Sequence, residues 1–211
     1  MKRFVLTLLL CACVFNLKAA SLQKNKVVTT TGFYQPTFLL EIASGVSMNH
    51  YELGMDFQDD ENLGFAGLYL SHTDYDVLGV TDDAVMTAIG IRGWQFSSQE
   101  GDLVGIDLHL GINRTTVGDY ARTGVEIAMS FYENISKNTS LIFGGAFRPE
   151  FLSLDWSTDT LSEIGFEFGV NYKLGQSTNL FSKYYHETLI DDDFNSARID
   201  DGALLGVTYI F

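Results

Sequence analysis

The ten residues Gly202–Phe211 (GALLGVTYIF) determine how the rest of this chain is interpreted. In an extended strand, successive side chains point to opposite faces. One face then carries Ala203, Leu205, Val207, Tyr209 and Phe211, and the other carries Leu204, Gly206, Thr208 and Ile210. Soluble domains usually end in a polar tail, whereas alternate apolar residues with aromatic residues at the boundary suit a lipid-facing strand. The stretch therefore predicts a membrane strand, with the closing strand of a soluble sandwich as the alternative.

The same stretch resembles the C-terminal signal of bacterial outer-membrane β-barrels, in which a terminal Phe is recognised by the insertion machinery. The residues that carry this resemblance are Val207, Tyr209 and Phe211. It implies that the barrel-insertion machinery is a partner of the C-terminal strand.

Residues 1–20 have the features of a secretory signal peptide. Met1–Arg3 is basic, Phe4–Phe15 is apolar but too short to cross a bilayer as a helix, and small residues near Ala20 allow cleavage. Residues 21–36 show no sustained hydrophobic period, and we expect them to form a mobile N-terminal lead-in.

Both cysteines, Cys11 and Cys13, lie inside the predicted signal peptide. The processed chain would therefore lack a disulfide framework, a thiolate zinc site and a cysteine nucleophile. Lipidation of Cys13 is the alternative to cleavage near Ala20.

Charge limits the choice of partner. Removing Lys2, Arg3 and Lys18 from the 13 basic residues leaves 10 against 27 acidic residues, a net charge of −17. Such a field repels nucleic acid, so we expect no nucleic-acid partner.

From residue 37 onward the chain consists of short alternating segments separated by polar turns, without a sustained helical stripe. Most segments have the length that a tilted strand needs to cross a bilayer. We therefore predict that 37–211 is all-β and forms a single antiparallel transmembrane β-barrel, with ten strands and eight as the alternative. The ten predicted segments are 37–44, 47–57, 63–73, 84–96, 103–113, 121–132, 139–148, 161–174, 178–189 and 202–211.

The predicted connections alternate in length from the second segment onward. Short connections are expected at 58–62, 97–102, 133–138 and 175–177, and longer ones at 74–83, 114–120, 149–160 and 190–201. Barrels of this class have short periplasmic turns and longer outer loops. The alternation fits an even strand number with both termini in the periplasm.

The polar face of each segment favours a barrel over a sandwich, although both alternate. In the fifth segment, for example, Asp107 and His109 stand among glycines opposite a wholly aliphatic face. Small residues with scattered charges suit a narrow lumen, and an uncharged apolar face suits lipid. The third segment is ambiguous, because Ala66, Leu68 and Leu70 could face either way.

By this register a set of charged residues points into the lumen. Paired charges are tolerable in a confined interior, whereas isolated ones are costly. The alternatives are therefore a lumen plugged by ion pairs and a narrow path whose acidic excess favours cations. The inward residues are Glu52, Asp56, Arg92, Asp107, His109, Arg122, Glu126, Arg148, Glu163, Glu167 and Lys173, with Lys183 and Glu187 on a less regular segment.

The chain resembles the YfaZ family of small bacterial outer-membrane proteins in three stretches. These are Tyr51–Phe57 with the turn and strand that follow, Gly165–Tyr185, and Ile199–Gly202 leading into the terminal strand. The resemblance covers about half of the processed chain and rests on glycines and aromatic residues at strand spacing. It implies a signal peptide, an outer-membrane barrel and a porin-like or unassigned role, and it supplies no catalytic residues.

We therefore expect a non-enzymatic outer-membrane protein, porin-like or structural, in contact with outer-membrane lipid and lipopolysaccharide. A surface interaction protein that uses acidic outer loops is one alternative. A lipid-modifying enzyme built on His109 or His50 is another, although no G-x-S-x-G turn is present. Asp191–Asp193 lacks the spacing of a calcium loop, so we expect neither metal nor cofactor.

Overall fold

The computed structural model describes residues 36–58, 64–75, 84–96, 105–155, 161–175, 177–191 and 193–211. The predicted signal peptide and all of the predicted lead-in except Pro36 lie outside these residues. Among the residues described, no helix is long and apolar enough to cross a membrane.

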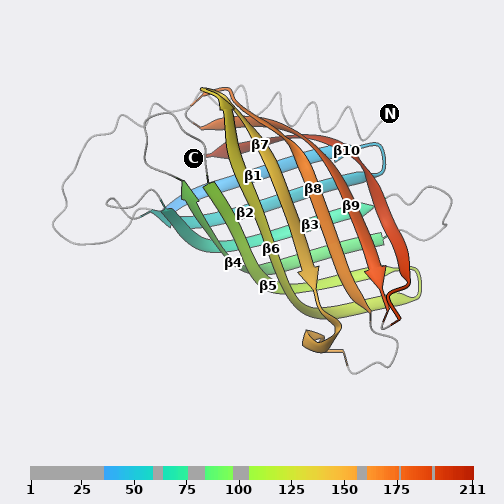
Figure 1. Cartoon of the computed structure of the whole chain (residues 1–211). Coiled ribbons are helices and arrows are strands. Elements are labelled where there is room, and N and C mark those ends of the chain that lie inside the picture. The colour runs from blue at the N-terminus through green and yellow to red at the C-terminus, as the bar shows by residue number, and fades with distance from the viewer. Residues whose placement is uncertain are drawn as a thin grey trace. The chain divides into compact units, whose positions relative to one another are not determined.

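Ten strands in the described chain pair in sequence order and close into an antiparallel barrel (Figure 1). This arrangement confirms the predicted ten-stranded fold, and the eight-stranded alternative is wrong. The strands are β1 (Pro36–Gly45), β2 (Met48–Gln58), β3 (Gly64–Tyr75), β4 (Ala84–Phe96), β5 (Gly105–Val117), β6 (Tyr120–Ser136), β7 (Thr139–Arg148), β8 (Ser162–Lys173), β9 (Thr178–Ile190) and β10 (Ser196–Ile210). A 3-10 turn, η1 (Glu150–Leu152), follows β7.

The C-terminal stretch closes the barrel against β1. The two strands pair from Leu39 opposite Ile210 to Gly45 opposite Leu204. At the seam, the amide of Phe38 donates to the carbonyl of Phe211 at 2.8 Å, and the amide of Phe211 donates back at 2.9 Å. Closure pairs both sheet edges, which would otherwise be costly in a membrane.

The two ends of the barrel differ in their connections. β1 begins and β10 finishes at one end, here called the terminal end, and the β1–β2, β5–β6 and β9–β10 turns lie at the other, called the distal end. The regular alternation of short and long connections is wrong. β5 and β6 run on through Arg114 and Tyr120, so that only Gly118 and Asp119 connect them, and the positive φ of Gly118 (55°) permits this tight turn. β10 likewise begins at Ser196, which shortens the β9–β10 connection to 191–195.

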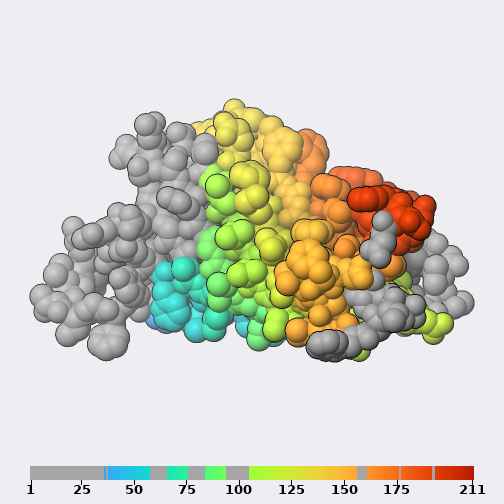
Figure 2. Space-filling view, turned by 60° about the horizontal axis from the view of Figure 1, so that its bottom comes forward, coloured from blue at the N-terminus to red at the C-terminus, as the bar shows by residue number. Residues whose placement is uncertain are grey.

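The outer face of the wall is apolar, and none of the described residues forms a second layer over it. Figure 2 shows strands from β4 to β8 lying side by side across this face. On β5, for example, Ile106, Leu108, Leu110 and Ile112 are all more than 40% exposed, and the row ends at Arg114. A soluble sandwich would cover such a face with another sheet, and water would make its exposure unfavourable. The barrel is therefore a transmembrane barrel, with hydrocarbon as the solvent of its outer face.

The ambiguity of the third segment is resolved by β3. Leu68 and Leu70 are about half exposed on the outer face, whereas Tyr69 is buried inside. The Tyr69 hydroxyl donates to Glu126 at 3.2 Å across the lumen. A tyrosine inside and leucines outside give each side chain its preferred surroundings.

Glycines on the inner face make room for large side chains. A Cβ placed on Gly206 would lie 2.2 Å from the ring of Phe181, and one on Gly165 would lie 2.4 Å from a Glu187 carboxylate oxygen. At these two positions of the inner face, the absence of a glycine side chain leaves room for the aromatic or charged side chain of the neighbouring strand.

Candidate functional site: the charged lumen

Among the residues that the structure describes, inward side chains form three ion-pair networks, each centred on one basic residue. The period of two puts the charges of each strand on the inner face, and barrel closure brings distant strands together. The central residues are Arg92 on β4, Arg148 on β7 and Lys183 on β9. Their side chains are 2%, 5% and 13% exposed, so each network is shielded from bulk water.

The first network surrounds Arg92. Its guanidinium donates to Glu52 and, at 3.1 Å, to the Oδ2 atom of Asp107. His109 Nε2 lies 3.4 Å from Glu52, and its Nδ1 lies 3.8 Å from Asp107 Oδ1. Asp56 is 2% exposed nearby and forms no ion pair within the described part of the chain. Three carboxyl groups therefore gather around one guanidinium and one imidazole.

The second network joins four strands through Arg148. Its guanidinium donates to Glu126 at 2.6 Å and to Glu187 at 2.9 Å, and it lies 3.8 Å from Glu163. Glu163 also accepts hydrogen bonds from Thr115 and Tyr120. Every carboxylate in this network has a donor.

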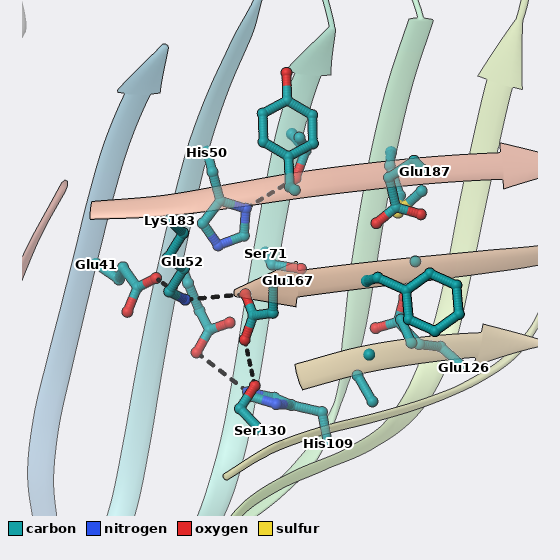
Figure 3. Close-up of a pocket in the computed structure, with 18 of the residues that line it drawn as sticks. Glu41, His50, Glu52, Ser71, His109, Glu126, Ser130, Glu167, Lys183 and Glu187 are labelled. Carbon is teal, nitrogen blue, oxygen red and sulfur yellow. Dashed lines mark hydrogen bonds and ion pairs between the residues drawn. The ribbon is translucent and has the colours of Figure 1, made fainter. Parts of the chain in front are cut away.

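The third network lies beside the first and is visible in the close-up of the lumen (Figure 3). Lys183 lies 3.2 Å from Glu167 and 3.7 Å from Glu41, and Ser130 donates to Glu167. Thr208 of the C-terminal strand donates to Glu41 at 2.9 Å. The network therefore ties the β1–β10 seam to β6, β8 and β9.

Arg122 is fully buried near the distal end, and no carboxylate of the described residues lies within hydrogen-bond range of it. It donates to Asn113 at 2.7 Å and to the carbonyl of Pro149 at 2.9 Å. The residues after η1 then continue along the edge that β6 extends beyond β7, where Leu154 donates to the carbonyl of Thr123 at 2.7 Å. Arg122 thus anchors the chain segment that covers this edge.

The networks leave a small cavity of about 170 Å³ in the lumen. Its lining includes side chains from all three networks and the tyrosines Tyr69, Tyr75, Tyr132 and Tyr185. Polar cavities of this size hold a few water molecules. The lumen is therefore a filled interior with a small polar pocket rather than a wide channel.

Ten of the eleven predicted lumen charges belong to these networks or to the buried groups beside them. Lys173 is the exception: it lies at the end of β8, and the described residues give it no ion pair. Lys183 and Glu187 point inward with Phe181 and Tyr185, which are both 5% exposed.

The sequence interpretation missed Glu41 and the inward tyrosines. On β1 the inward positions Leu39 and Ala43 are apolar like their outward neighbours, so no alternation marked Glu41. Strand pairing identifies Glu41 as an inward residue, because it lies directly between Glu52 of β2 and Thr208 of β10.

The histidines do not form a hydrolytic site with serine in the part of the lumen described. His50 and His72 contact threonine hydroxyls, at 2.8 and 3.2 Å, and His109 contacts carboxylates. Nor do three His, Cys, Asp or Glu side chains converge to hold a metal among the residues described.

The β9–β10 turn carries Asp191 and Asp193 of one predicted acidic outer loop, whereas Asp200 and Asp201 belong to β10. Asp191 accepts hydrogen bonds from the side chain and backbone of Asn195 and from the backbone of Asp193. These bonds hold the pKa of Asp191 below its usual range. They also fix Phe194 at the tip, with φ of 62° and 88% exposure. Asp76, Asp82, Asp83, Asp159 and Asp192 lie outside the described residues.

No protein-family model matches the chain, and no curated protein matches it. A membrane-protein structure determined in work on in-meso crystallisation is similar, with 14% identity, coverage of 85% of this chain and 83% of that one, and a TM-score of 0.43. The translocator domain of the autotransporter NalP from Neisseria meningitidis is 9% identical, with 83% and 87% coverage and a TM-score of 0.37. A de novo designed transmembrane β-barrel is 10% identical, with 85% and 100% coverage and a TM-score of 0.32.

Proposed function

We propose that this chain is a small porin-like protein of a bacterial outer membrane, whose lumen is narrowed by ion pairs and admits only water and small cations. The observation that carries the proposal is the filled lumen, in which Arg92, Arg148 and Lys183 form ion pairs with neighbouring strands and with strands two positions away around a cavity of about 170 Å³. A solute larger than a hydrated ion would have to break these pairs.

The excess of carboxyl groups supports the preference for cations. Among the described residues, the inward acids include Glu41, Glu52, Asp56, Asp107, Glu126, Glu163, Glu167, Glu187 and Asp200. The inward bases that contact them or lie beside them are Arg92, Arg122, Arg148 and Lys183. Rings of acidic side chains favour cations over anions in pores. The four bases already bind carboxylates or other polar groups of the protein, so they are not available to attract anions.

Single-channel recording in planar bilayers tests this proposal. We expect a small conductance with a reversal potential on the cation side in a KCl gradient. Replacing Arg92 or Arg122 with Ala should increase the conductance, because each fills the lumen. Arg114→Ala, on the exposed outer rim, is the matched control and should leave it unchanged. No conductance in the parent or in either lumen variant would reject the pore and leave a structural barrel.

Location and partners complete the proposal. Phe38, Phe57, Tyr172 and Phe211 are exposed aromatic residues on strand ends at the terminal end, as at a membrane interface. We propose cleavage of the signal peptide, recognition of the C-terminal strand by the insertion machinery, contact with lipopolysaccharide and kinship with the YfaZ family. Heat-modifiable migration of the membrane fraction on SDS gels is the test of the class, and a chain that folds in buffer without amphiphile would reject it.

A second candidate function uses the β9–β10 turn as a surface for another protein. It is supported by Phe194, whose positive φ is uncommon for a bulky residue and whose ring is exposed. Because 196–201 belongs to β10, the test replaces only 191–195 with a short Asn-Gly turn. Loss of cell-surface binding by a barrel that still refolds supports the idea, and unchanged binding rejects it.

A further inference from the structure

A threonine, a histidine and an aspartate meet on the outer face of the barrel, where β3 and β4 lie side by side (Figure 1). Thr87 is the register partner of His72, and its Oγ1 atom lies 3.2 Å from His72 Nδ1. The other imidazole nitrogen, Nε2, lies 3.1 Å from Asp74 Oδ1. A hydroxyl within hydrogen-bond reach of an imidazole that a carboxylate orients is the arrangement of nucleophile and base in hydrolases that form acyl intermediates.

All three side chains are accessible from outside the barrel. The side chains of His72 and Asp74 are each 45% exposed, and Thr87 is exposed beside them. The barrel holds a similar pair inside, in which His50 Nδ1 lies 2.8 Å from Thr73 Oγ1. That pair lines the lumen cavity, where a lipid cannot reach it. Only the outer cluster therefore faces the surroundings of the membrane wall.

The cluster lies where the apolar outer face ends. On the same strands and face, two residues nearer the terminal end, Leu70, Ile89 and Ile112 pair with one another and are 49%, 62% and 47% exposed. These side chains face hydrocarbon. The row that contains His72 and Thr87 is therefore near the boundary between hydrocarbon and headgroups, where the acyl esters of membrane lipids lie.

β5 adds a positive charge to this cluster. Arg114 is the register partner of Thr87 on that strand, and it is exposed on the same outer face. Residues directly opposite each other in a sheet have Cβ atoms about 4.5–5.5 Å apart. Arg114 Nη1 donates to Thr123 at 2.8 Å, and a guanidinium carries five N–H donors. Its charge favours a negative oxygen that develops beside Thr87.

We propose that Thr87, His72 and Asp74 hydrolyse the acyl ester of a membrane lipid, with Thr87 as the nucleophile. The Thr87 hydroxyl gives its proton to His72 Nδ1, and its oxygen bonds to the ester carbonyl carbon while Arg114 faces the oxygen that becomes negative. The bond from that carbon to the alcohol oxygen then breaks, and His72 returns the proton to the leaving alkoxide. Asp74 accepts a hydrogen bond from Nε2–H, which keeps Nδ1 as the base.

Water completes the reaction. It gives a proton to His72, and its oxygen attacks the acyl carbon on Thr87. The acyl–oxygen bond breaks, the proton passes to the Thr87 oxygen, and the fatty acid leaves. This activity goes beyond the proposed function, because the cluster lies on the outer face and not in the lumen.

The activity is tested on the full barrel refolded in vesicles of phosphatidylethanolamine and phosphatidylglycerol, with or without lipopolysaccharide. Mass spectrometry measures released fatty acid, lysophospholipid and deacylated lipopolysaccharide. We expect the parent to release fatty acid, and the deacylated product that accompanies it identifies the lipid. Thr87→Val and His72→Gln should each lower the release at least about 100-fold, whereas Thr87→Ser should retain it. Thr116→Val is the matched control at the rim of β5, where the hydroxyl donates to the Val85 carbonyl, and should act at the parent's rate.

Two results would overturn the site. If neither the parent nor Thr87→Ser releases fatty acid from either kind of vesicle, the three side chains form only a polar rim. Release at the parent's rate by Thr87→Val or His72→Gln would place the activity elsewhere. If a variant does not refold, acid-quenched parent decides, because an acyl group on Thr87 supports the site and its absence during turnover rejects it. None of these readouts depends on conductance, so a non-conducting barrel leaves the inference intact.

Discussion

Replacement of Arg148 by Ala measures how strongly the lumen depends on its ion pairs. Arg148 donates to Glu126 at 2.6 Å and to Glu187 at 2.9 Å, and its side chain is 5% exposed. Removing one partner of a buried pair leaves an uncompensated charge and costs about 3–5 kcal/mol. Glu187 loses its Arg148 donor, and Glu126 keeps only the Tyr69 hydroxyl, so we expect a loss at the upper end of this range.

The assay is urea unfolding of the barrel in phospholipid vesicles, followed by circular dichroism and gel mobility. Arg198→Ala is the matched control, because Arg198 pairs with Asp201 at 2.5 Å with its side chain 67% exposed. Exposed pairs contribute about 0–1 kcal/mol. The triple change Arg148→Met, Glu126→Gln and Glu187→Gln should recover most of the loss, since it removes the charges together. A loss for Arg148→Ala no larger than for Arg198→Ala would refute the reasoning.

Three further results are expected. Leu110→Arg on the outer face should destabilise the barrel in vesicles by about 2–4 kcal/mol, and Thr116→Arg near the rim by about 0–1 kcal/mol, as measured by the same unfolding assay. Gly206→Ala should cost about 1–3 kcal/mol because the added Cβ meets an aromatic ring, whereas Gly175→Ala, with nothing within 4 Å, should cost less than 1 kcal/mol. The folded-state pKa of Asp191 is lowered, so the hydrogen bonds of its turn should be fully formed above the ordinary aspartate pKa and lost as the pH falls through the lowered value. Hydrogen exchange of the turn amides from pH 7 to pH 2 measures this loss. Protection that does not change with pH, after correction for intrinsic exchange rates, would contradict the prediction.

Strand positions were predictable from sequence because the membrane imposes a period of two on every wall residue. The predicted limits of β4 and β7 agree with the structure, and all ten predicted segments overlap strands. The turn between β5 and β6 was mispredicted, because Arg114 and the threonines after it are polar on both faces. Strands that project beyond the membrane can be polar all round, so the sequence signal ends before the strand does.

Partners across the lumen were not predictable to the same degree. Arg148, Glu126 and Glu187 come from β7, β6 and β9, and their meeting depends on strand stagger and closure rather than on local pattern. Sequence placed these residues on the inner face, but it could not say which charge meets which. Glu41 shows the limit most clearly, because its neighbours on β1 gave no alternation and only its register reveals its role.

The polar lumen and its charge excess follow from different requirements. Lipid requires an apolar outer face on every strand. If the inner face were apolar as well, each strand would be a continuous hydrophobic run, so the inner face is polar. A narrow barrel then buries that face, and burial requires each charge to find a partner. Pairing alone would be met by equal numbers of acids and bases, whereas Lys183 lies near two carboxylates, Glu167 and Glu41. Around Arg92 the carboxyl groups of Glu52 and Asp107 share one guanidinium and one imidazole, so the excess of acids reflects this shared pairing as well as the demands of the lipid face.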